Sequence, residues 1–393
     1  MICAALINEA HGKVLLLERS DRLGKKLSAT GNGQGNLTNV NFGSSHYFTQ
    51  DLTERGKIEK VLSNATEKEL IQFFESLGGL FLADERGRVY PTCRQASSLT
   101  DLLRYRLSAG KTEISLSSKV TKIKHDGKYF NLTVQTEQGE ECFCSENVII
   151  CAGGKAAKNF GTDGNGYSLV KPFSHSITSL YPALVQLKTD ARKTKSLKGI
   201  RVMNAKVSAY EGEKILKTTR GDLIFTEYGV SGDAIFKLSS YVTQLSEKNT
   251  VTLSVDLLPE ISENVLYSTL IEKSKNASVD RQELLCGILN NQIGRLIMKE
   301  SEDIKTVVEK VKKFSITVTG TLGFDYAQVT KGGIPLNEVT EELESKYQKG
   351  LYFAGEILDV DGECGGYNLQ WAFSSAVTVA NALNKKPKDR GQI

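Results

Sequence analysis

The stretch that decides the fold is "GLYFAGEILDVDGECGGYNLQ", residues 350–370 of a 393-residue chain. Its apolar start predicts a buried strand, after which Gly355 permits a tight turn and the acid Glu356 follows at once. The pair Gly365–Gly366 stands just before a helix that we expect to start near Asn368. Exposed amides at the start of a helix bind anions and polar rings. Strand, glycine, acid, glycine pair and helix together predict a ligand-binding edge of a parallel sheet.

Two further strand ends point to the same edge. "KVLLLE" predicts a buried strand that ends on Glu18, and "NVIICAGG" predicts one that ends on Ala152 and Gly153. An acid at the end of the second strand of a dinucleotide-binding unit holds the ribose hydroxyls. Because the carboxyl ends of parallel strands meet at one edge, we expect these ends to converge with Gly355–Glu356, which predicts a dinucleotide site.

The opening of the chain departs from this pattern. A dinucleotide-binding unit begins with a strand and a Gly-x-Gly-x-x-Gly turn, whereas "MICAALINEAHG" predicts a helix of small residues and a turn at Gly12. Loss of the central first strand would leave buried backbone groups unpaired, at about 1–3 kcal/mol each. A whole domain is stable by only about 5–15 kcal/mol. We therefore expect the natural protein to begin upstream of Met1.

A polar loop with several glycines, "TGNGQGNLTN", spans residues 30–39. Gly31, Gly33 and Gly35 tolerate positive φ and let the backbone approach a flat or charged ligand closely. Lys25 and Lys26 precede the loop and are placed to face phosphates. Taken alone, the loop fits ordinary turns equally well, because glycine and asparagine are common turn residues.

Composition narrows the class of protein. The chain is 40% hydrophobic and 24% charged, with a net charge of +4, as in ordinary soluble proteins of two or three packed units. The densest basic stretch, residues 191–201, has no aromatic residues, so we expect no nucleic-acid partner. No apolar run approaches the about 20 residues of a membrane span, so we expect no membrane partner either. Nothing in the sequence indicates a protein partner.

The cysteines favour a cytoplasmic protein without a bound metal. There are seven of them, scattered and odd in number, which fits reduced thiols better than a disulfide framework. Cys142 and Cys144 alternate along an expected strand, and the absence of a second nearby pair argues against a metal site.

Periodicity divides the chain into three domains. We predict a Rossmann-like α/β domain from residues 1–170 and 335–393, without its first strand and glycine-rich turn. Short strands with glycine turns predict an inserted β-rich substrate domain over residues 171–258 and 313–334. Helical spacing over residues 259–312 predicts a small helical domain.

Six longer motifs, read together, identify a family. They are "LGKKLSATGNGQGNLTN", "GRVYPTCRQASS", "VIICAGGKA", "FTEYGVSGDAIF", "TVTGTLGFDYAQVTKGGI" and "GLYFAGEILDVDGECGGYNLQWAFSS". Across essentially its whole length the chain resembles the bacterial three-domain FAD-dependent oxidoreductases. That family includes aminoacetone oxidase and the 3-dehydro-bile-acid Δ4,6-reductase.

The resemblance implies how FAD would lie. Glu18 would bind the adenosine ribose, the backbone of Val120 would lie near the adenine, and Glu356 would lie near the ribityl chain and pyrophosphate. The helix that starts at Asn368 would point at the flavin ring, where its positive end stabilises reduced flavin. The implied cofactor-binding set is Glu18, Arg19, Lys26, Gly31, Asn32, Asn36, Val120, Ala152, Gly153, Gly355, Glu356, Gly366, Asn368 and Leu369. Relatives usually carry Arg-Cys where this chain has Gln34–Gly35, so a charge and a thiol are lost near the expected flavin.

The resemblance also implies a reaction. We expect reduced FAD to deliver hydride to a carbon–carbon double bond conjugated with a ketone, as in 3-oxo-Δ4 or Δ4,6 bile-acid intermediates. NAD(P)H would dock only transiently, because "GTDGNGY", residues 161–167, lacks the spacing of a second dinucleotide unit. Two alternatives stay open: an amine oxidase of the aminoacetone type, and a flavin-free binding protein if the first strand is truly absent.

The proton donor is the least determined part of the site. The four histidines are isolated in the sequence: His11, His46, His125 and His175. We therefore expect proton chemistry to use another residue type or water. The candidate donors or ketone ligands are Tyr326, Tyr228 and Tyr367, each of which more commonly would serve packing.

Overall fold

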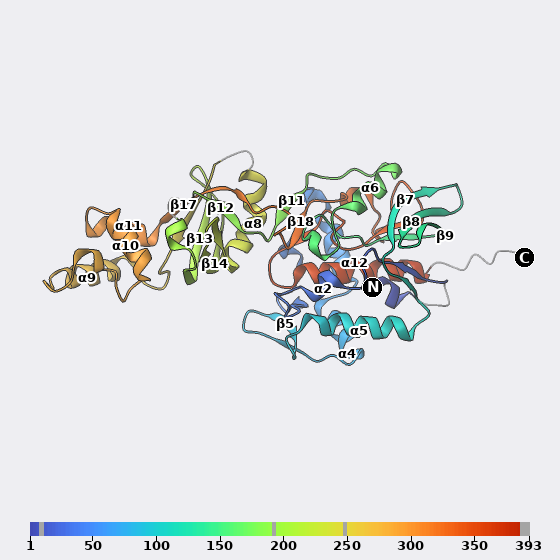
Figure 1. The fold of residues 1–393 in the computed structure, drawn as a ribbon, viewed down its shortest axis with the longest axis horizontal. Helices are drawn as coiled ribbons and strands as arrows, with labels where there is room; N and C mark the ends of the chain where they lie inside the picture. The colour runs from blue at the N-terminus through green and yellow to red at the C-terminus, as the bar shows by residue number, and fades with distance from the viewer. Residues whose placement is uncertain (8–11, 191–193, 247–249, 386–393) are drawn as a thin grey trace, which may run out of the picture. The chain divides into compact units, whose positions relative to one another are not determined.

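The computed structural model describes residues 1–7, 12–190, 194–246 and 250–385. They divide into two compact units (Figure 1), one made of Met1–Leu180 with Val329–Ile393 and the other of Tyr181–Gln328. We call them unit 1 and unit 2. His11, one of the four histidines, lies outside the described residues. No helix in the described ranges is both long and apolar enough to cross a membrane.

Unit 1 contains two separate parallel strand pairs. β1 (Leu15–Leu17) pairs with β6 (Glu113–Ser115), and β10 (Val148–Ile150) pairs with β19 (Leu351–Phe353). The end of β10 and the end of β19 therefore meet, as predicted, but β1 is in a different sheet. The prediction of one continuous edge was wrong, because among the described strands none is hydrogen-bonded to both β1 and β10.

A long helix, α12 (Tyr367–Lys385), runs through unit 1 and is drawn in red in Figure 1. Its small and apolar residues are buried, and the indole nitrogen of Trp371 donates to the carbonyl of Gly355 at 3.1 Å. The Ser375 hydroxyl accepts from the Gly355 amide at 2.9 Å. These two bonds fix the start of the helix against the turn after β19. α12 also packs against the shorter helices α1 (Ile2–Leu6), α3 (Arg55–Ser63) and α4 (Glu67–Ser76).

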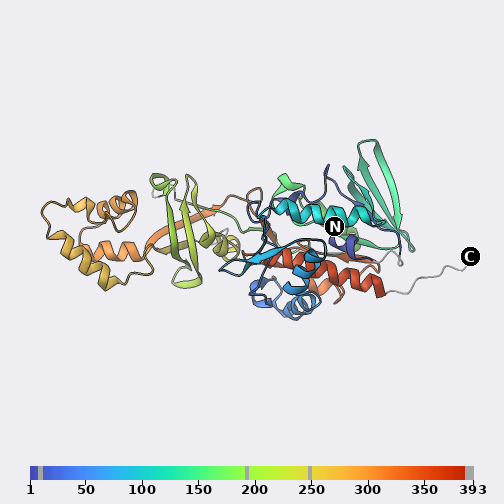
Figure 2. The ribbon, with the colours of Figure 1, turned by 90° about the horizontal axis from the view of Figure 1, so that it is seen from below.

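Unit 1 also contains two three-stranded antiparallel sheets. One has the order β2–β5–β4, and the other is a meander, β7–β8–β9, with short connections at residues 126–129 and 137–138 (Figure 2). The bounds are β2 (Thr38–Asn39), β4 (Phe81–Ala83), β5 (Arg88–Pro91), β7 (Lys119–His125), β8 (Phe130–Thr136) and β9 (Gly139–Ser145). Helix α5 (Ala96–Ala109) follows β5.

Unit 2 holds a closed six-stranded barrel, which confirms the predicted β-rich insertion. The strand order is β12 (Leu187–Thr189), β15 (Gly229–Ser231), β14 (Lys214–Phe225), β13 (Arg201–Glu211), β16 (Val251–Asp256) and β17 (Phe314–Thr321). Helix α8 (Asp233–Ser246) adds Leu238 and Val242 to the barrel's core. The stretch with helical spacing forms α9 (Glu263–Ser274), α10 (Asn291–Lys299) and α11 (Ile304–Lys312).

Candidate cofactor-binding site

The turn after β19 joins three segments of unit 1. Gly355 has a φ of +80°, which glycine adopts without strain. The two carboxylate oxygens of Glu356 are both engaged: one accepts from the amide of Thr330 at 2.9 Å, and the other pairs with Lys26 at 2.6 Å. Lys26 also donates to the carbonyl of Ala156 at 3.3 Å. The structure therefore brings together two predicted site residues that lie 330 positions apart in the sequence.

Lys25, the other lysine expected to face phosphates, pairs instead with Asp21 at 2.6 Å. Both lysines belong to the short helix α2 (Lys25–Ser28). Because Lys26 is held by Glu356, its charge serves first to position the acid of the β19 turn.

The loop after β10 lies directly against the same turn. The Thr330 hydroxyl accepts from the amides of Lys155 and Ala156 at 2.8 and 2.9 Å. Gly153 has a φ of +72°. A Cβ at Gly154 would come within 2.8 Å of a carboxylate oxygen of Glu356. This close backbone approach needs glycine, which explains the double glycine at the end of the predicted strand.

The end of β1 is covered by a segment that the sequence analysis did not include in the site. Arg19 pairs with Asp163 at 2.7 Å, and Asn165 donates from its side chain to the carbonyl of Val120 at 3.1 Å. Glu18 accepts from the amide of Ser20 at 2.8 Å. Residues 161–165 thus join the two positions expected at the adenosine end. The glycine spacing that excluded this segment as a second dinucleotide motif carried no signal of that contact.

The loop over residues 30–39 is tied to the start of α12. Gly31 and Asn32 have φ values of +58° and +54°. A Cβ at Gly31 would lie 2.8 Å from the amide of Asn36. With its amide oriented to satisfy both partners, Asn36 donates to the carbonyl of Thr38 and accepts from the amide of Gly366, both at 3.1 Å. The predicted flavin-side loop and the predicted ring-facing helix therefore form one structure.

A guanidinium group lies beside the unusual Gln34. Arg94 is 4.0 Å from the centre of the Tyr90 ring and 3.5 Å from the side-chain oxygen of Gln34. The stacked geometry is that of a cation–π contact. A positive charge is thus present near this part of the loop, although it comes from a different segment of the chain.

The first turn of α12 is built from glycine and an asparagine clasp. α12 begins at Tyr367, one residue before the predicted start. Gly366 has a φ of +104°, and a Cβ there would lie 2.5 Å from the backbone of Thr38. Asn368 accepts from the amide of Gly362 at 2.9 Å and donates to its carbonyl at 2.8 Å. Leu369 follows, half-buried. Asn368 therefore ties the first turn of the helix to the backbone of Gly362.

Buried acids lie close to this turn. Asp361 in β20 (Asp361–Gly362) is 1% exposed, and neither of its carboxylate oxygens has a hydrogen-bond partner. One oxygen of Asp359 and the hydroxyl of Tyr167 are also buried without a partner. Burial raises the pKa of Asp361 to about 7, against the opposing charge of Lys331.

Taken together, the residues of unit 1 fit FAD. An acid ends β1, glycines with positive φ admit close approach after β10 and β19, and a helix of 19 residues starts behind a glycine pair. The buried, unpaired polar atoms of Asp361, Asp359 and Tyr167 show that polar groups also gather near Glu356, in the turn after β19. The individual contacts of the cofactor-binding set stay predictions.

Two of the histidines that are isolated in the sequence have acidic partners in the tertiary structure. His46 pairs through Nδ1 with Glu363 at 3.0 Å, and His175 lies between Glu338 at 2.9 Å and Ser345 at 2.7 Å. Each partner is more than 160 residues away in sequence, so no local pattern could show the pairing.

His175, Glu338 and Ser345 have the residue types of a Ser-His-Glu triad, but they serve the structure. Burial lowers the pKa of His175, which keeps the ring neutral between its two partners. The Ser345 hydroxyl also accepts from the amides of Tyr347 and Gln348 at 3.1 and 3.0 Å, and the residue is 5% exposed. A substrate has no access to a hydroxyl so enclosed.

The three candidate tyrosines fall in both units. Tyr367 is 5% exposed and donates its hydroxyl to the carbonyl of Asn41 at 3.3 Å. Burial, aided by the charge of Glu363, raises the pKa of Tyr367 to about 12. Tyr228 and Tyr326 belong to unit 2, where Tyr326 is 61% exposed. Their catalytic roles stay predictions.

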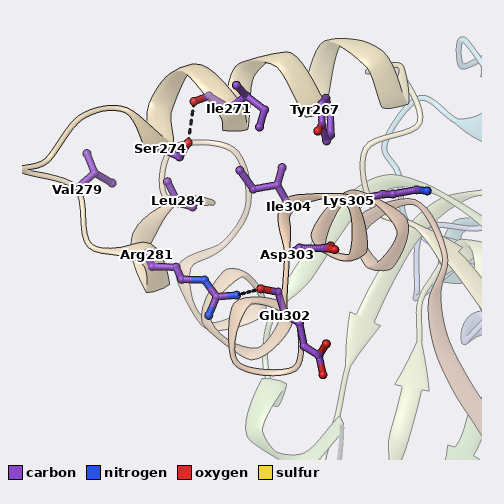
Figure 3. A pocket seen from close by; sticks show the side chains of 10 residues that line it. All are labelled: Tyr267, Ile271, Ser274, Val279, Arg281, Leu284, Glu302, Asp303, Ile304 and Lys305. Atoms are coloured by element: carbon purple, nitrogen blue, oxygen red, sulfur yellow. Dashed lines mark hydrogen bonds between the residues drawn. The ribbon is translucent and has the colours of Figure 1, made fainter.

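A groove of about 670 Å³ lies among the helices of unit 2 (Figure 3). It is bounded by α9, by the short helix η7 (Arg281–Glu283) and by the start of α11. Arg281 donates to the carbonyls of Ser301 and Glu302 at 2.7 and 2.6 Å, so its charge is already used within the fold. None of the predicted site residues lines this groove.

Comparison with known proteins places nearly the whole chain in one protein family. Residues 1–382 match the family described as HI0933-like protein Rossmann domain. The chain is 34% identical over 402 residues to a 3-dehydro-bile acid delta(4,6)-reductase of Clostridium scindens, with 98% of this chain and 96% of the relative covered. It is also 27% identical to a ribosomal RNA dihydrouridine synthase of Escherichia coli over 405 residues, covering 98% and 95%.

A solved structure supports the fold. The chain aligns to the FrdA subunit of an E. coli quinol fumarate reductase with a TM-score of 0.51 and 13% identity. The alignment covers 98% of this chain and 68% of that one. At this identity the likeness concerns the fold alone.

Proposed function

This chain belongs to the HI0933-like Rossmann-domain family of FAD-dependent oxidoreductases, and we propose that it reduces a carbon–carbon double bond conjugated with a ketone. The substrate class would be 3-oxo-Δ4 or Δ4,6 bile-acid or related steroid intermediates. The observation that carries this proposal is the 34% identity, over 98% of the chain, to a bile acid delta(4,6)-reductase.

The chain's own residues would hold the cofactor in unit 1. Glu18 would bind the ribose, Val120 would contact the adenine through its backbone, and Glu356 would lie beside the ribityl chain and pyrophosphate. When bound and reduced, the flavin supplies a hydride for the β-carbon of the substrate. The positive end of α12 stabilises negative charge placed before it. Lys26 keeps the Glu356 carboxylate oriented through their 2.6 Å pair.

NAD(P)H would be the source of electrons and would bind only transiently, since one dinucleotide-binding unit is evident. We also propose a cytoplasmic location. The seven cysteines support it, because all are described and none forms a disulfide.

A second candidate substrate is uridine in ribosomal RNA, favoured by two relatives named as dihydrouridine synthases at 26% and 27% identity. The double bond of uracil is also conjugated with a carbonyl, so the same hydride chemistry applies. RNA affinity, however, depends on cations that neutralise phosphates. Residues 259–312 carry eight basic and nine acidic residues. On the barrel, Lys198, Arg201 and Arg220 are paired with acids. The charge balance of residues 259–312 and the pairing of these three cations favour a small substrate.

One experiment separates these functions. The purified protein is reduced under anaerobic conditions with NADH or NADPH, and flavin absorbance is followed after addition of 3-oxochol-4-enoic acid, of a ribosomal RNA fragment, or of air alone. We expect reoxidation by the enone acid and recovery of the saturated ketone. Reoxidation only by RNA would support the synthase function instead. Fast reoxidation in air together with turnover of aminoacetone would support an amine oxidase. A protein that binds no flavin would contradict all three.

A further inference from the structure

His46 and Glu363 form a half-exposed acid–base pair in unit 1. His46 Nδ1 lies 3.0 Å from Glu363 Oε2, and the two side chains are 30% and 25% exposed. Among the described residues, no group is hydrogen-bonded to the other ring nitrogen, Nε2. A carboxylate on one nitrogen fixes the orientation of the ring. Nε2 is therefore the ring nitrogen that no described group engages, and it can carry a proton as a donor.

The ring is held by more than its ion pair. It stacks on the ring of Tyr367, with centroids 4.3 Å apart and planes inclined by 18°. The amide of Glu363 donates to the carbonyl of His46 at 2.9 Å. Beside them, β3 (Tyr47–Phe48) pairs with β20. Exposed ion pairs usually lack such support, so this pair is preorganised in a way that suits chemistry.

The pair adjoins the element expected to face the flavin. Glu363 lies three residues before Gly366, and α12 starts at Tyr367. Charged and titratable groups near the ring include Glu363 and Tyr367, with Tyr47 packed edge-on against Tyr367 and Arg88 acting on Tyr367 electrostatically. From α3, Glu59 accepts a hydrogen bond from Ser44, two residues before His46, at 3.0 Å.

The tyrosines of this cluster are poorly suited to give up a proton. Tyr367 donates its hydroxyl to Asn41, and Tyr47 is fully buried and donates to the carbonyl of Tyr367 at 3.0 Å. Of the three rings, His46 therefore combines exposure with a ring nitrogen that no described group engages.

We propose that His46, oriented by Glu363, is the proton donor of the reduction, an inference that rests on the proposed function. The hydride brings two electrons to the β-carbon, and His46 Nε2 gives its proton to the α-carbon next to the ketone. The carbon–carbon double bond becomes a single bond, and the ring is left neutral until water returns the proton. Glu363 acts as a positioning residue.

The test separates the two half-reactions of the holoenzyme. Three variants are reduced anaerobically with NAD(P)H and then mixed with 3-oxochol-4-enoic acid: His46→Gln, Glu363→Gln and His125→Gln. His125 is the last residue of β7 and is the matched control, because it is not among the predicted site residues. We expect His46→Gln to slow flavin reoxidation by about 10²–10⁴-fold, the usual contribution of a general acid. Flavin content and the rate of reduction by NAD(P)H should match the wild type. Glu363→Gln should slow reoxidation less and shift its pH profile.

Chemical rescue provides a second measurement. His46→Ala should regain reoxidation rate in proportion to added imidazolium, whereas His125→Gln should show no response. An unchanged reoxidation rate in His46→Gln, or a loss of flavin in both His46 variants, would overturn the proposal. Failure of the proposed function looks different, because then the wild type and His125→Gln would also leave the enone unreduced.

Discussion

Asp361 combines full burial with an unpaired carboxyl group, and this makes stability depend on pH. Burial raises its pKa to about 7 in the folded protein, against about 3.9 in an unfolded chain. Between these values the folded state holds a proton that the unfolded state has lost. The free energy of unfolding should therefore fall as pH rises through this window, by up to about 4 kcal/mol, and the loss should be complete above the folded pKa.

Asp361→Asn removes the titrating group and should remove this loss. We expect the variant to be more stable than the wild type at about pH 8 and to lose that advantage near about pH 4. Urea unfolding of both proteins across this pH range measures the free energy of unfolding of unit 1. Glu75→Gln, at an exposed acid, is the control and should follow the wild type. Parallel curves for Asp361→Asn and the wild type would show that the acid does not titrate in this window.

Contacts between residues far apart in the chain are the part of the site that could not be predicted from the sequence. The predictions found Lys26 and Glu356 separately, from a loop and a strand end, but their contact spans 330 positions. His46 carried no local signal at all, since its partner Glu363 is 317 positions away. Such pairs depend on how distant elements are packed, which periodicity does not encode.

At the scale of elements, the junction of α12 with the loop before β2 depends on Gly366. Its φ of +104° disfavours other residues, and a Cβ would lie 2.5 Å from the Thr38 backbone. Gly366→Ala should push the loop away and break the bond between Asn36 and the Gly366 amide. We expect loss of flavin and a fall in stability well beyond the about 1 kcal/mol of backbone strain alone.

Gly127→Ala is a closely matched control for that variant. Gly127 has nearly the same φ, +102°, but no atom lies within 4 Å of the position of its Cβ. It should lose about 1 kcal/mol and keep its flavin. Absorbance at the flavin maximum and thermal unfolding measure both effects. Equal behaviour of the two variants would mean that strain, and not the contact with Thr38, is what matters at Gly366.

Elements with strong local signals were predicted well. The strand before Gly355 forms β19, and the inserted β-rich region forms a barrel. The sheet pairing of β1 was not predicted correctly. A strand's apolar pattern indicates burial, but it does not say which strand is its neighbour.

At the scale of the whole molecule, the two units have separate interiors. Each of the four buried hydrophobic clusters draws its described members from a single unit. The predicted cofactor-binding residues all belong to unit 1. We therefore expect calorimetry to show two unfolding transitions, of which only one rises in temperature with added FAD, because a ligand stabilises the unit whose folded state binds it.

Two core variants assign those transitions. Leu238 of α8 is 0% exposed in the barrel core, and Leu103 of α5 is 1% exposed in unit 1. Replacing either leucine by alanine should cost about 2–5 kcal/mol. Leu238→Ala should lower the transition that FAD leaves unchanged, with flavin content preserved, whereas Leu103→Ala should lower the transition that FAD raises. A single transition that moves with both variants and with FAD would show that the two units unfold as one cooperative body, so that binding in unit 1 also stabilises the barrel.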